Sequence, residues 1–168
     1  MLKRSCFFFI CIPFFLQAEP FVAKLEHAYS NTEFLFQNKT QRFTCKPYGV
    51  ITLEDLYFSP LAKKGCKSAI REFYKKHPDL EYLFLDVLKT QQRYHIVFRK
   101  NRCIIYAQGE NTYSELLLHR GLAQIKPFFQ DTEFLYSFKN AQKNAQLQKR
   151  GLWEGTLSVE CKSALYRP

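Results

Sequence analysis

The residues of this chain that could do chemistry gather around one short hairpin, where basic side chains alternate with aromatic ones. They are Arg93, Tyr94, Arg99, Lys100, Arg102 and Tyr106. Arginine and lysine neutralise phosphates, and aromatic rings stack on unpaired bases. The pattern indicates a surface for single-stranded DNA or RNA. A second interpretation fits the same pattern: Tyr94 and Tyr106 point into a core, and the basic turn is only solvated.

The overall charge favours a polyanionic partner. The 168 residues include 25 Lys and Arg against 15 Asp and Glu, which gives a formal net charge of +10 at pH 7. Such an excess suits nucleic acid, an anionic membrane surface or an acidic glycan. A basic exported protein that binds no polyanion is the alternative.

The sequence lacks the motifs of several other kinds of functional site. The four histidines are scattered, and no two of them stand at the spacing of metal ligands. The chain contains no Gly-x-Ser-x-Gly elbow, no phosphate-binding loop and no dinucleotide fingerprint. The sequence therefore argues against a resident cofactor.

The N-terminus has the composition of a secretory signal peptide. Lys3 and Arg4 precede an apolar run over 6–16, and the small residue Ala18 follows. The run is too short to span a bilayer as a helix of the mature protein. We expect cleavage after Ala18 and a mature chain without a transmembrane span, periplasmic or secreted from a bacterium. A retained N-terminal anchor is the alternative.

Four cysteines follow the signal peptide, namely Cys45, Cys66, Cys103 and Cys161. An even number in an exported chain favours disulfides, and three pairings are possible. No two of the four have the spacing of a zinc site. We therefore predict that the four cysteines form disulfides. The alternative is that one of them is a reactive, catalytic thiol.

Local patterns predict the strands that position these residues. A weakly amphipathic stretch over 19–30 suggests a short helix, and a hairpin is expected over 33–44. Further strands are expected over 48–53, 82–88, 94–98 and 103–107.

Helix signals are stronger than the strand signals. Apolar residues recur at helical spacing over 67–77, where Ser68 can cap the start and Pro78 can stop the end. Thr112 and Glu115 have the spacing of a capping box for a second helix, which Gly121 ends.

A third helix is expected over 132–149, capped by Asp131 and ended at Gly151. Together the elements predict an α+β fold: an OB-type five-stranded β-barrel with about three packed helices. We divide the chain into a signal peptide (1–18), an N-terminal extension of helix and hairpin (19–44), the OB-fold domain (45–155) and a C-terminal tail (156–168).

Motifs in the second half of the chain carry a family resemblance. They are Tyr106-Ala107-Gln108-Gly109, Ser114-Glu115-Leu116-Leu117, Gly121-Leu122-Ala123 and Gly151-Leu152-Trp153. In this order, the segment from about residue 94 to residue 153 resembles the C-terminal half of a staphylococcal-nuclease-like (thermonuclease) domain. The resemblance implies that fold, and calcium-dependent hydrolysis of DNA and RNA phosphodiesters. Acidic residues would hold the cation, a glutamate would activate water, and two arginines would brace the phosphate.

The catalytic residues of that family are largely missing. Aligning Pro60 with the proline of the family's Asp-x-Pro-Glu loop places Phe58 at the Asp position and Leu61 at the Glu position. Leu53 then stands where the family has its first arginine. The second arginine position holds Lys100, which cannot grip a phosphate with a planar two-point contact.

A shifted register would restore an acidic site. Glu54 or Asp55 would then lie at the mouth of the barrel as a calcium ligand, with Lys100, or Arg99 or Arg102, bracing the phosphate. The alternative for Glu54 and Asp55 is a solvated turn after a strand.

The resemblance also extends the binding surface. Lys126 and Phe128 follow the Gly-Leu-Ala motif in a loop that borders the nucleotide site of the family. Phe128 and its neighbour Phe129 could equally belong to the core.

The sequence thus predicts an exported nucleic-acid-binding protein that has lost the family's catalysis. One alternative is a divergent calcium-dependent nuclease, and another is a protein-interaction scaffold in the cell envelope.

Overall fold

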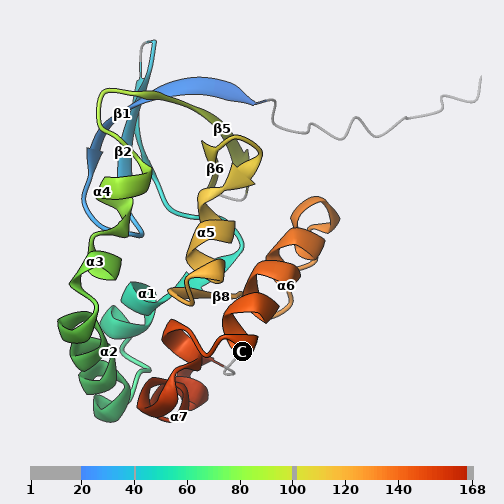
Figure 1. Cartoon of the computed structure of the whole chain (residues 1–168). Coiled ribbons are helices and arrows are strands. Elements are labelled where there is room, and N and C mark those ends of the chain that lie inside the picture. Colours follow the sequence, from blue (N-terminus) through green and yellow to red (C-terminus); the bar gives the residue numbers. More distant parts are fainter. Residues whose placement is uncertain (1–19, 40, 100–101, 166–168) are drawn as a thin grey trace, which may run out of the picture.

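The structure is a computed structural model that describes residues 20–39, 41–99 and 102–165 (Figure 1). The protein is mixed α+β, with an antiparallel sheet at one end and most of its helices at the other. No helix among these residues is long and apolar enough to cross a membrane. The expected signal peptide and Lys100 lie outside the described residues.

The main sheet has six antiparallel strands in the order β3-β2-β1-β5-β6-β7. Their bounds are β1 Phe21–Ala28, β2 Phe34–Asn38, β3 Gln41–Cys45, β5 Arg93–Arg99, β6 Arg102–Gln108 and β7 Asn111–Thr112. A second, two-stranded sheet pairs β4 (Val50–Thr52) with β8 (Ala123–Ile125). The expected hairpin over 33–44 and the strand pair around 94–107 are confirmed.

Two of the strands that are far apart in the sheet order, β3 and β6, are joined directly. A disulfide links Cys45, the last residue of β3, to Cys103 of β6. The chain that leaves β3 then forms a parallel bridge between Pro47 and Cys103. The Cys103 N–H donates to the Lys46 carbonyl at 2.9 Å, and the Tyr48 N–H donates to the Cys103 carbonyl at 3.0 Å. A closed five-stranded barrel is not confirmed, because this contact is one bridge rather than a full strand pair.

Helices cover the ends of the sheets. Their bounds are α1 Leu53–Phe58, α2 Lys64–Lys76, α3 Pro78–Glu81, α4 Leu83–Val87, α5 Tyr113–His119, α6 Thr132–Leu147, the 3-10 helix η1 Gly151–Trp153, and α7 Gly155–Leu165. The capping box of Thr112 and Glu115 and the Asp131 cap are confirmed. Gly121, with φ at +72°, follows the end of α5 as expected.

Three expected elements are wrong in type or extent. The stretch over 19–30 is not a helix but strand β1, because pairing with β2 and β5 on both sides overrides its weak helical pattern. The stretch over 82–88 is not a strand: it is mostly α4. A short apolar run of this kind has no period that separates helix from strand. The helix expected from residue 67 starts at Lys64, so Ser68 is not its cap.

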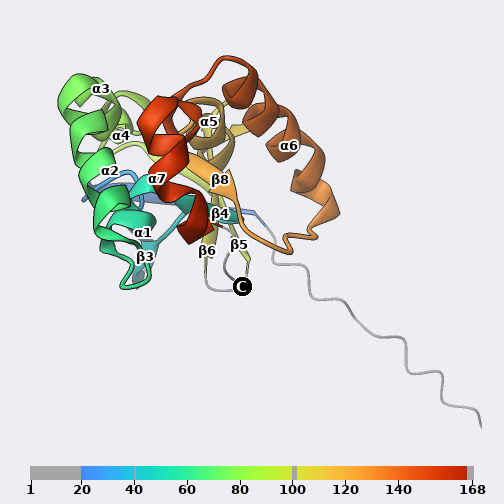
Figure 2. The ribbon, with the colours of Figure 1, turned by 90° about the horizontal axis from the view of Figure 1, so that it is seen from below.

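Two of the domain boundaries that we drew fall inside secondary-structure elements: the one after residue 44 lies in β3, and the one after residue 155 lies in α7. Residues 21–45 supply three strands of the main sheet, with β1 between β2 and β5. Residues 155–165 form α7, which lies beside α2 and is tied to it by the disulfide Cys66–Cys161 (Figure 2). Two disulfides are typical of proteins that fold in an oxidising compartment.

Asn31 is the polar centre of the core. Its side chain is buried and donates to the carbonyls of Leu80 and Glu81 at 2.9 and 3.0 Å. Its Oδ1 accepts from the Phe84 N–H at 3.1 Å and from the Tyr113 hydroxyl at 3.0 Å. One amide therefore ties the β1–β2 loop to α3, α4 and α5.

We expect Asn31→Ala to lower the free energy of unfolding by about 3 kcal/mol, because several buried polar groups lose their partner at once. Urea unfolding followed by circular dichroism measures the change. Asn140→Ala, at an exposed position on α6, is the control and should change little. A loss below about 1 kcal/mol for Asn31→Ala would contradict the central role of this amide.

Candidate nucleic-acid interface

A pocket of about 430 Å³ lies where the ends of β5 and β6 meet the segment between β8 and α6. Its lining includes Tyr48, Arg99, Arg102, Lys126, Phe128 and Phe129. The structure thus brings together four residues that the sequence predicted to bind nucleic acid: Arg99, Arg102, Lys126 and Phe128. They come from two segments, the β5–β6 hairpin and the loop before α6, up to 29 residues apart in the sequence, and no local pattern joins the loop to the hairpin.

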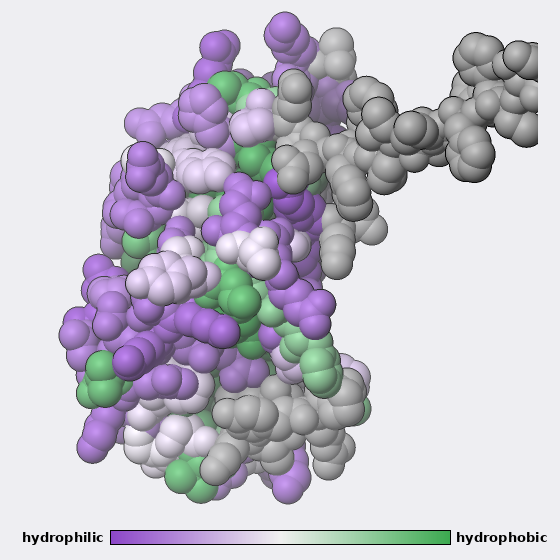
Figure 3. All heavy atoms as spheres, turned by 90° about the vertical axis from the view of Figure 1, so that its right-hand side faces the viewer, coloured by the Kyte–Doolittle hydropathy of each residue, from purple (hydrophilic) through white to green (hydrophobic). Residues whose placement is uncertain are grey.

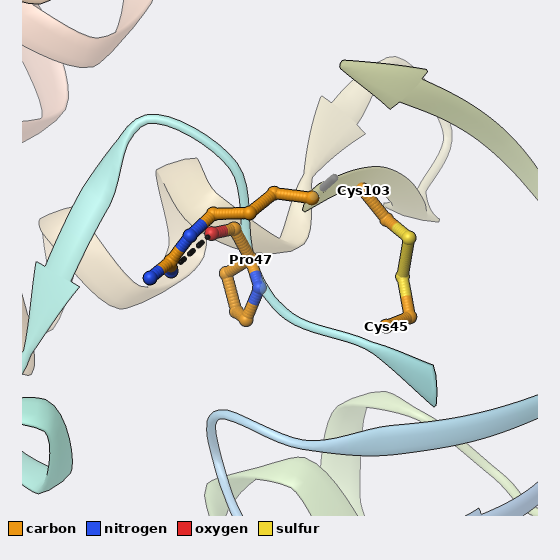
Figure 4. The surroundings of a disulfide bond; sticks show 4 residues. Cys45, Pro47 and Cys103 are labelled. Carbon is orange, nitrogen blue, oxygen red and sulfur yellow. Dashed lines mark hydrogen bonds between the residues drawn. A yellow bond between two sulfur atoms is a disulfide. The ribbon is translucent and has the colours of Figure 1, made fainter. Parts of the chain in front are cut away.

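Arg102 is held in place by the joint between β3 and β6. It stands next to the disulfide residue Cys103, and its Nη1 donates to the Pro47 carbonyl at 3.1 Å (Figure 4). One nitrogen of the guanidinium is thereby fixed to the backbone. Arg102 lines the pocket, and the N–H groups that do not bind the Pro47 carbonyl can donate to a phosphate.

Lys126 adds a second cation beside Arg102. It is half-buried, and burial lowers the pKa of its ammonium group, with a further lowering by the charge of Arg102. The charge of Asp55 acts in the opposite direction on the same pKa. Two neighbouring cations that repel each other are stabilised by an anion, so the pair forms an anion-binding arrangement.

Arg99 also lines the pocket, and it lies beside two acidic residues. Its guanidinium lies 3.2 Å from a Glu133 carboxylate oxygen and 4.0 Å from one of Asp131. Asp131 also caps α6 and accepts a hydrogen bond from the Tyr48 hydroxyl at 2.9 Å. A phosphate would therefore meet less competition at Arg102 and Lys126 than at Arg99.

The two phenylalanines of the loop have different environments. Phe129 packs against Tyr48 at 5.4 Å and stacks on Phe138 at 5.5 Å between ring centroids. Phe128 is 82% exposed and has a left-handed backbone, with φ at +59°. Such a conformation is uncommon for a bulky residue. The core interpretation holds for Phe129, whereas Phe128 presents its ring to solvent at the pocket, where a base could stack on it.

Gly49 gives these rings their room. Its φ is +75°, and a Cβ at this position would come within 2.7 to 2.9 Å of ring atoms of Phe129 and Phe138. Any larger residue would displace the floor of the pocket.

Other predicted binding residues lie elsewhere. Arg93 begins β5, pairs with Lys24 of β1, and is about 20 Å from Arg99 along the strand. Tyr106 is half-buried, and burial is the main cause of its raised pKa. Tyr94 is buried in the core, as the second interpretation expected.

The two acidic residues considered for a calcium site accept structural hydrogen bonds. Asp55 completes the capping box of α1 by accepting from the N–H of the N-cap residue Thr52 at 3.1 Å. Glu54 accepts from the Asn31 N–H at 3.1 Å and from the Thr32 hydroxyl at 2.7 Å. Over residues 20–39, 41–99 and 102–165, no group of three or more His, Cys, Asp or Glu side chains could hold a metal ion.

Sequence reasoning missed Tyr48 and Asp131 as parts of the site. Tyr48 was assigned only to a strand, and Asp131 only to a helix cap. Their hydrogen bond joins residues 83 positions apart, for which the sequence offers no signal.

Hydrophilic side chains cover most of the face on the α6 side, with a small hydrophobic area near its middle (Figure 3). This agrees with the chain's mean hydropathy of −0.31.

Comparison with known proteins adds no family. No protein-family model matches the chain, and no curated protein matches it. The likeness to the thermonuclease family stays a hypothesis that rests on the motifs between residues 94 and 153.

The Tyr48–Asp131 contact predicts that the folded protein loses stability at alkaline pH. Burial, reinforced by the Asp131 carboxylate, raises the pKa of Tyr48 from 10.0 to about 12. The folded protein therefore holds the phenol proton more tightly than the unfolded chain does. The stability from this group is complete below pH 10 and is lost as the pH rises toward 12.

We expect Tyr48→Phe to lose less stability than the wild type does between pH 10 and pH 12, because it has no phenol to ionise. Urea unfolding at a series of pH values measures the two slopes. Tyr136→Phe, at an exposed tyrosine, should keep the wild-type slope. Equal slopes for Tyr48→Phe and the wild type would refute the assignment.

Proposed function

We propose that this chain is an exported, nuclease-like protein that binds single-stranded nucleic acid and does not hydrolyse it. The observation that carries the proposal is the convergence of Arg102, Lys126 and the exposed ring of Phe128 on one pocket. The two cations can bind a phosphate, and the ring can stack on a base. The two disulfides fit the proposed export, because they form in oxidising compartments.

Single strands suit the pocket better than a duplex. A ring at the rim can stack only on a base whose face is open, as in an unpaired strand. The arginine fork and the lysine can hold the phosphate next to that base. This combination binds with little sequence preference and with strong salt dependence.

An OB-type barrel is part of the proposal. Support comes from the order β3-β2-β1-β5-β6 and from the contact that joins β3 to β6 at Pro47 and Cys103. Small five-stranded barrels of this type are partly open and bind oligonucleotides on one face and its loops.

The absence of hydrolysis follows from the residues at the family's catalytic positions. Three of these positions hold Leu53, Phe58 and Leu61, none of which can bind a cation, activate water or brace a phosphate, and the fourth holds Lys100 in place of an arginine. Glu54 and Asp55 already accept structural hydrogen bonds.

A divergent calcium-dependent nuclease is the second candidate. One observation favours it: the charge of Asp55 acts on the Lys126 ammonium group, so a carboxylate lies in the vicinity of the pocket. If both functions fail, the envelope scaffold would take their place.

The binding site is tested by Arg102→Ala combined with Lys126→Ala. We expect the affinity for a short single-stranded DNA to fall roughly 10- to 100-fold, and the salt dependence to decrease by about two counterions. Fluorescence anisotropy of a labelled oligonucleotide over a salt series measures both quantities. Lys139→Ala with Lys143→Ala, two exposed lysines of α6, is the matched control. Unchanged affinity in the Arg102 and Lys126 variant would remove the proposed site.

Stacking is tested at Phe128. We expect Phe128→Ala to weaken binding by about 1–3 kcal/mol with an unchanged salt dependence, because a ring is lost and no charge. Tyr136→Ala removes an aromatic ring that is 78% exposed on α6, against 82% for Phe128, and should bind as the wild type does. The same anisotropy assay applies. An equal loss in both variants would show that the effect is not local.

Removing each disulfide in turn distinguishes an effect on stability from an effect on DNA binding. Replacing either pair by serine should lower the free energy of unfolding by about 2–4 kcal/mol, because each closes a long loop. Only the pair Cys45 and Cys103 lies beside Arg102, so only its removal should also weaken DNA binding below the melting temperature. The pair Cys66 and Cys161, between α2 and α7, is the control. Thermal melts and anisotropy together check this, and equal loss of binding in both variants would contradict it.

A further inference from the structure

A second pocket, of about 530 Å³, opens between the β1–β2 loop and helices α1 to α4. These helices lie together on one side of the molecule (Figure 1). None of the residues that line this pocket lines the pocket at Arg102 and Lys126. Its volume is within the usual range for small-molecule sites.

Six of the thirteen residues that line this pocket carry aromatic rings. They are Tyr29, Tyr57, Phe58, Tyr74, Tyr82 and Phe84. Phe84 and Ile70 are buried and make the floor, while Tyr29, Phe58 and Tyr82 are 52 to 78% exposed and stand at the rim. Exposed large rings around a hollow mark a binding site rather than a packed core.

The carboxylates of this pocket lack cationic partners. Glu54 and Glu81 both line it, and no salt bridge to either occurs within the described residues. The Glu54 carboxylate is fixed by its two neutral donors, Asn31 and Thr32. Burial raises the pKa of the Tyr74 phenol, and the charges of Glu54 and Glu81 raise it further, so both carboxylates act on the interior.

Two cations, Arg71 and Lys75, also line the pocket, and both lie at exposed positions. Lys75 lies 2.7 Å from a Glu72 carboxylate oxygen, outside the pocket wall. Arg71 donates to the Tyr57 hydroxyl at 3.3 Å. Arg71 and Lys75 are both exposed, so solvent screens their charges, and the inner part of the pocket offers a ligand rings and carboxylates.

We propose that this pocket binds a small organic cation that carries an alkylated ammonium group. The negative faces of the rings attract such a cation, and it buries its methyl groups against them at the same time. Glu81 and Glu54 supply the balancing charge. A free ammonium ion or a metal would need more oxygen ligands than the rings leave available.

Choline is the probe, and 3,3-dimethylbutan-1-ol is its uncharged isostere of the same shape. Calorimetric titration of the chain from residue 19 to residue 168, with its disulfides formed, measures both affinities. We expect choline to bind at least about tenfold more tightly than the isostere, because only the cation gains from the rings and carboxylates. Equal affinities, or no heat from choline, would overturn the proposal.

Two variants locate the site. Glu81→Gln and Tyr82→Ala should each weaken choline binding severalfold, whereas Tyr136→Ala on α6 should not change it. Glu81→Gln should leave the affinity for the isostere unchanged, since it removes charge and keeps shape. Choline binding that survives both pocket variants would place the cation elsewhere and contradict the proposal. None of these outcomes bears on nucleic-acid binding, because the two pockets share no residue.

Discussion

The contact between the end of β3 and the start of β6 is the constraint on which the proposed binding site depends. The Cys45–Cys103 disulfide and the Pro47 bridge bring together two strands that stand apart in the sheet order. The chain after β3 must then run along β6, which sets Tyr48 and Gly49 against the loop before α6. The same contact supplies the carbonyl that fixes Arg102. A site built on this joint needs little reorganisation to bind an anion.

A second constraint acts at the start of α1. The capping box at Thr52 starts α1 directly after β4, so the neighbouring acids Glu54 and Asp55 point to different surroundings. Glu54 joins Asn31 and the aromatic pocket, whereas Asp55 stays with Thr52 and acts on Lys126. The two neighbouring acids of this short helix therefore have separate roles: Glu54 lines the aromatic pocket, and Asp55 completes the capping box at Thr52.

The sequence predicted those parts of the fold that local chemistry determines. The Thr112–Glu115 capping box, the Asp131 cap and the hairpins follow from spacing alone. The predictions of a helix over 19–30 and of a strand over 82–88 were wrong, because contacts remote in sequence decide both conformations. Partner strands pair with the first stretch, and the Asn31 amide binds the second. Arg102, Lys126 and Phe128 were predicted as parts of one binding surface, but only the family resemblance joined the loop of Lys126 and Phe128 to the hairpin of Arg102. Their meeting in one pocket, and the supporting role of Tyr48, depend on contacts that no local pattern encodes.

The most direct test of the central claim is a single incubation that reads binding and cleavage together. End-labelled single-stranded DNA would be mixed with the chain from residue 19 to residue 168, once with calcium and once with EDTA. The retained fraction and the strand length would both be measured. Retention of full-length strands under both conditions is the predicted result. Calcium-dependent shortening of the strands would contradict the loss of catalysis, and strands that are neither retained nor cut at low salt would contradict binding itself.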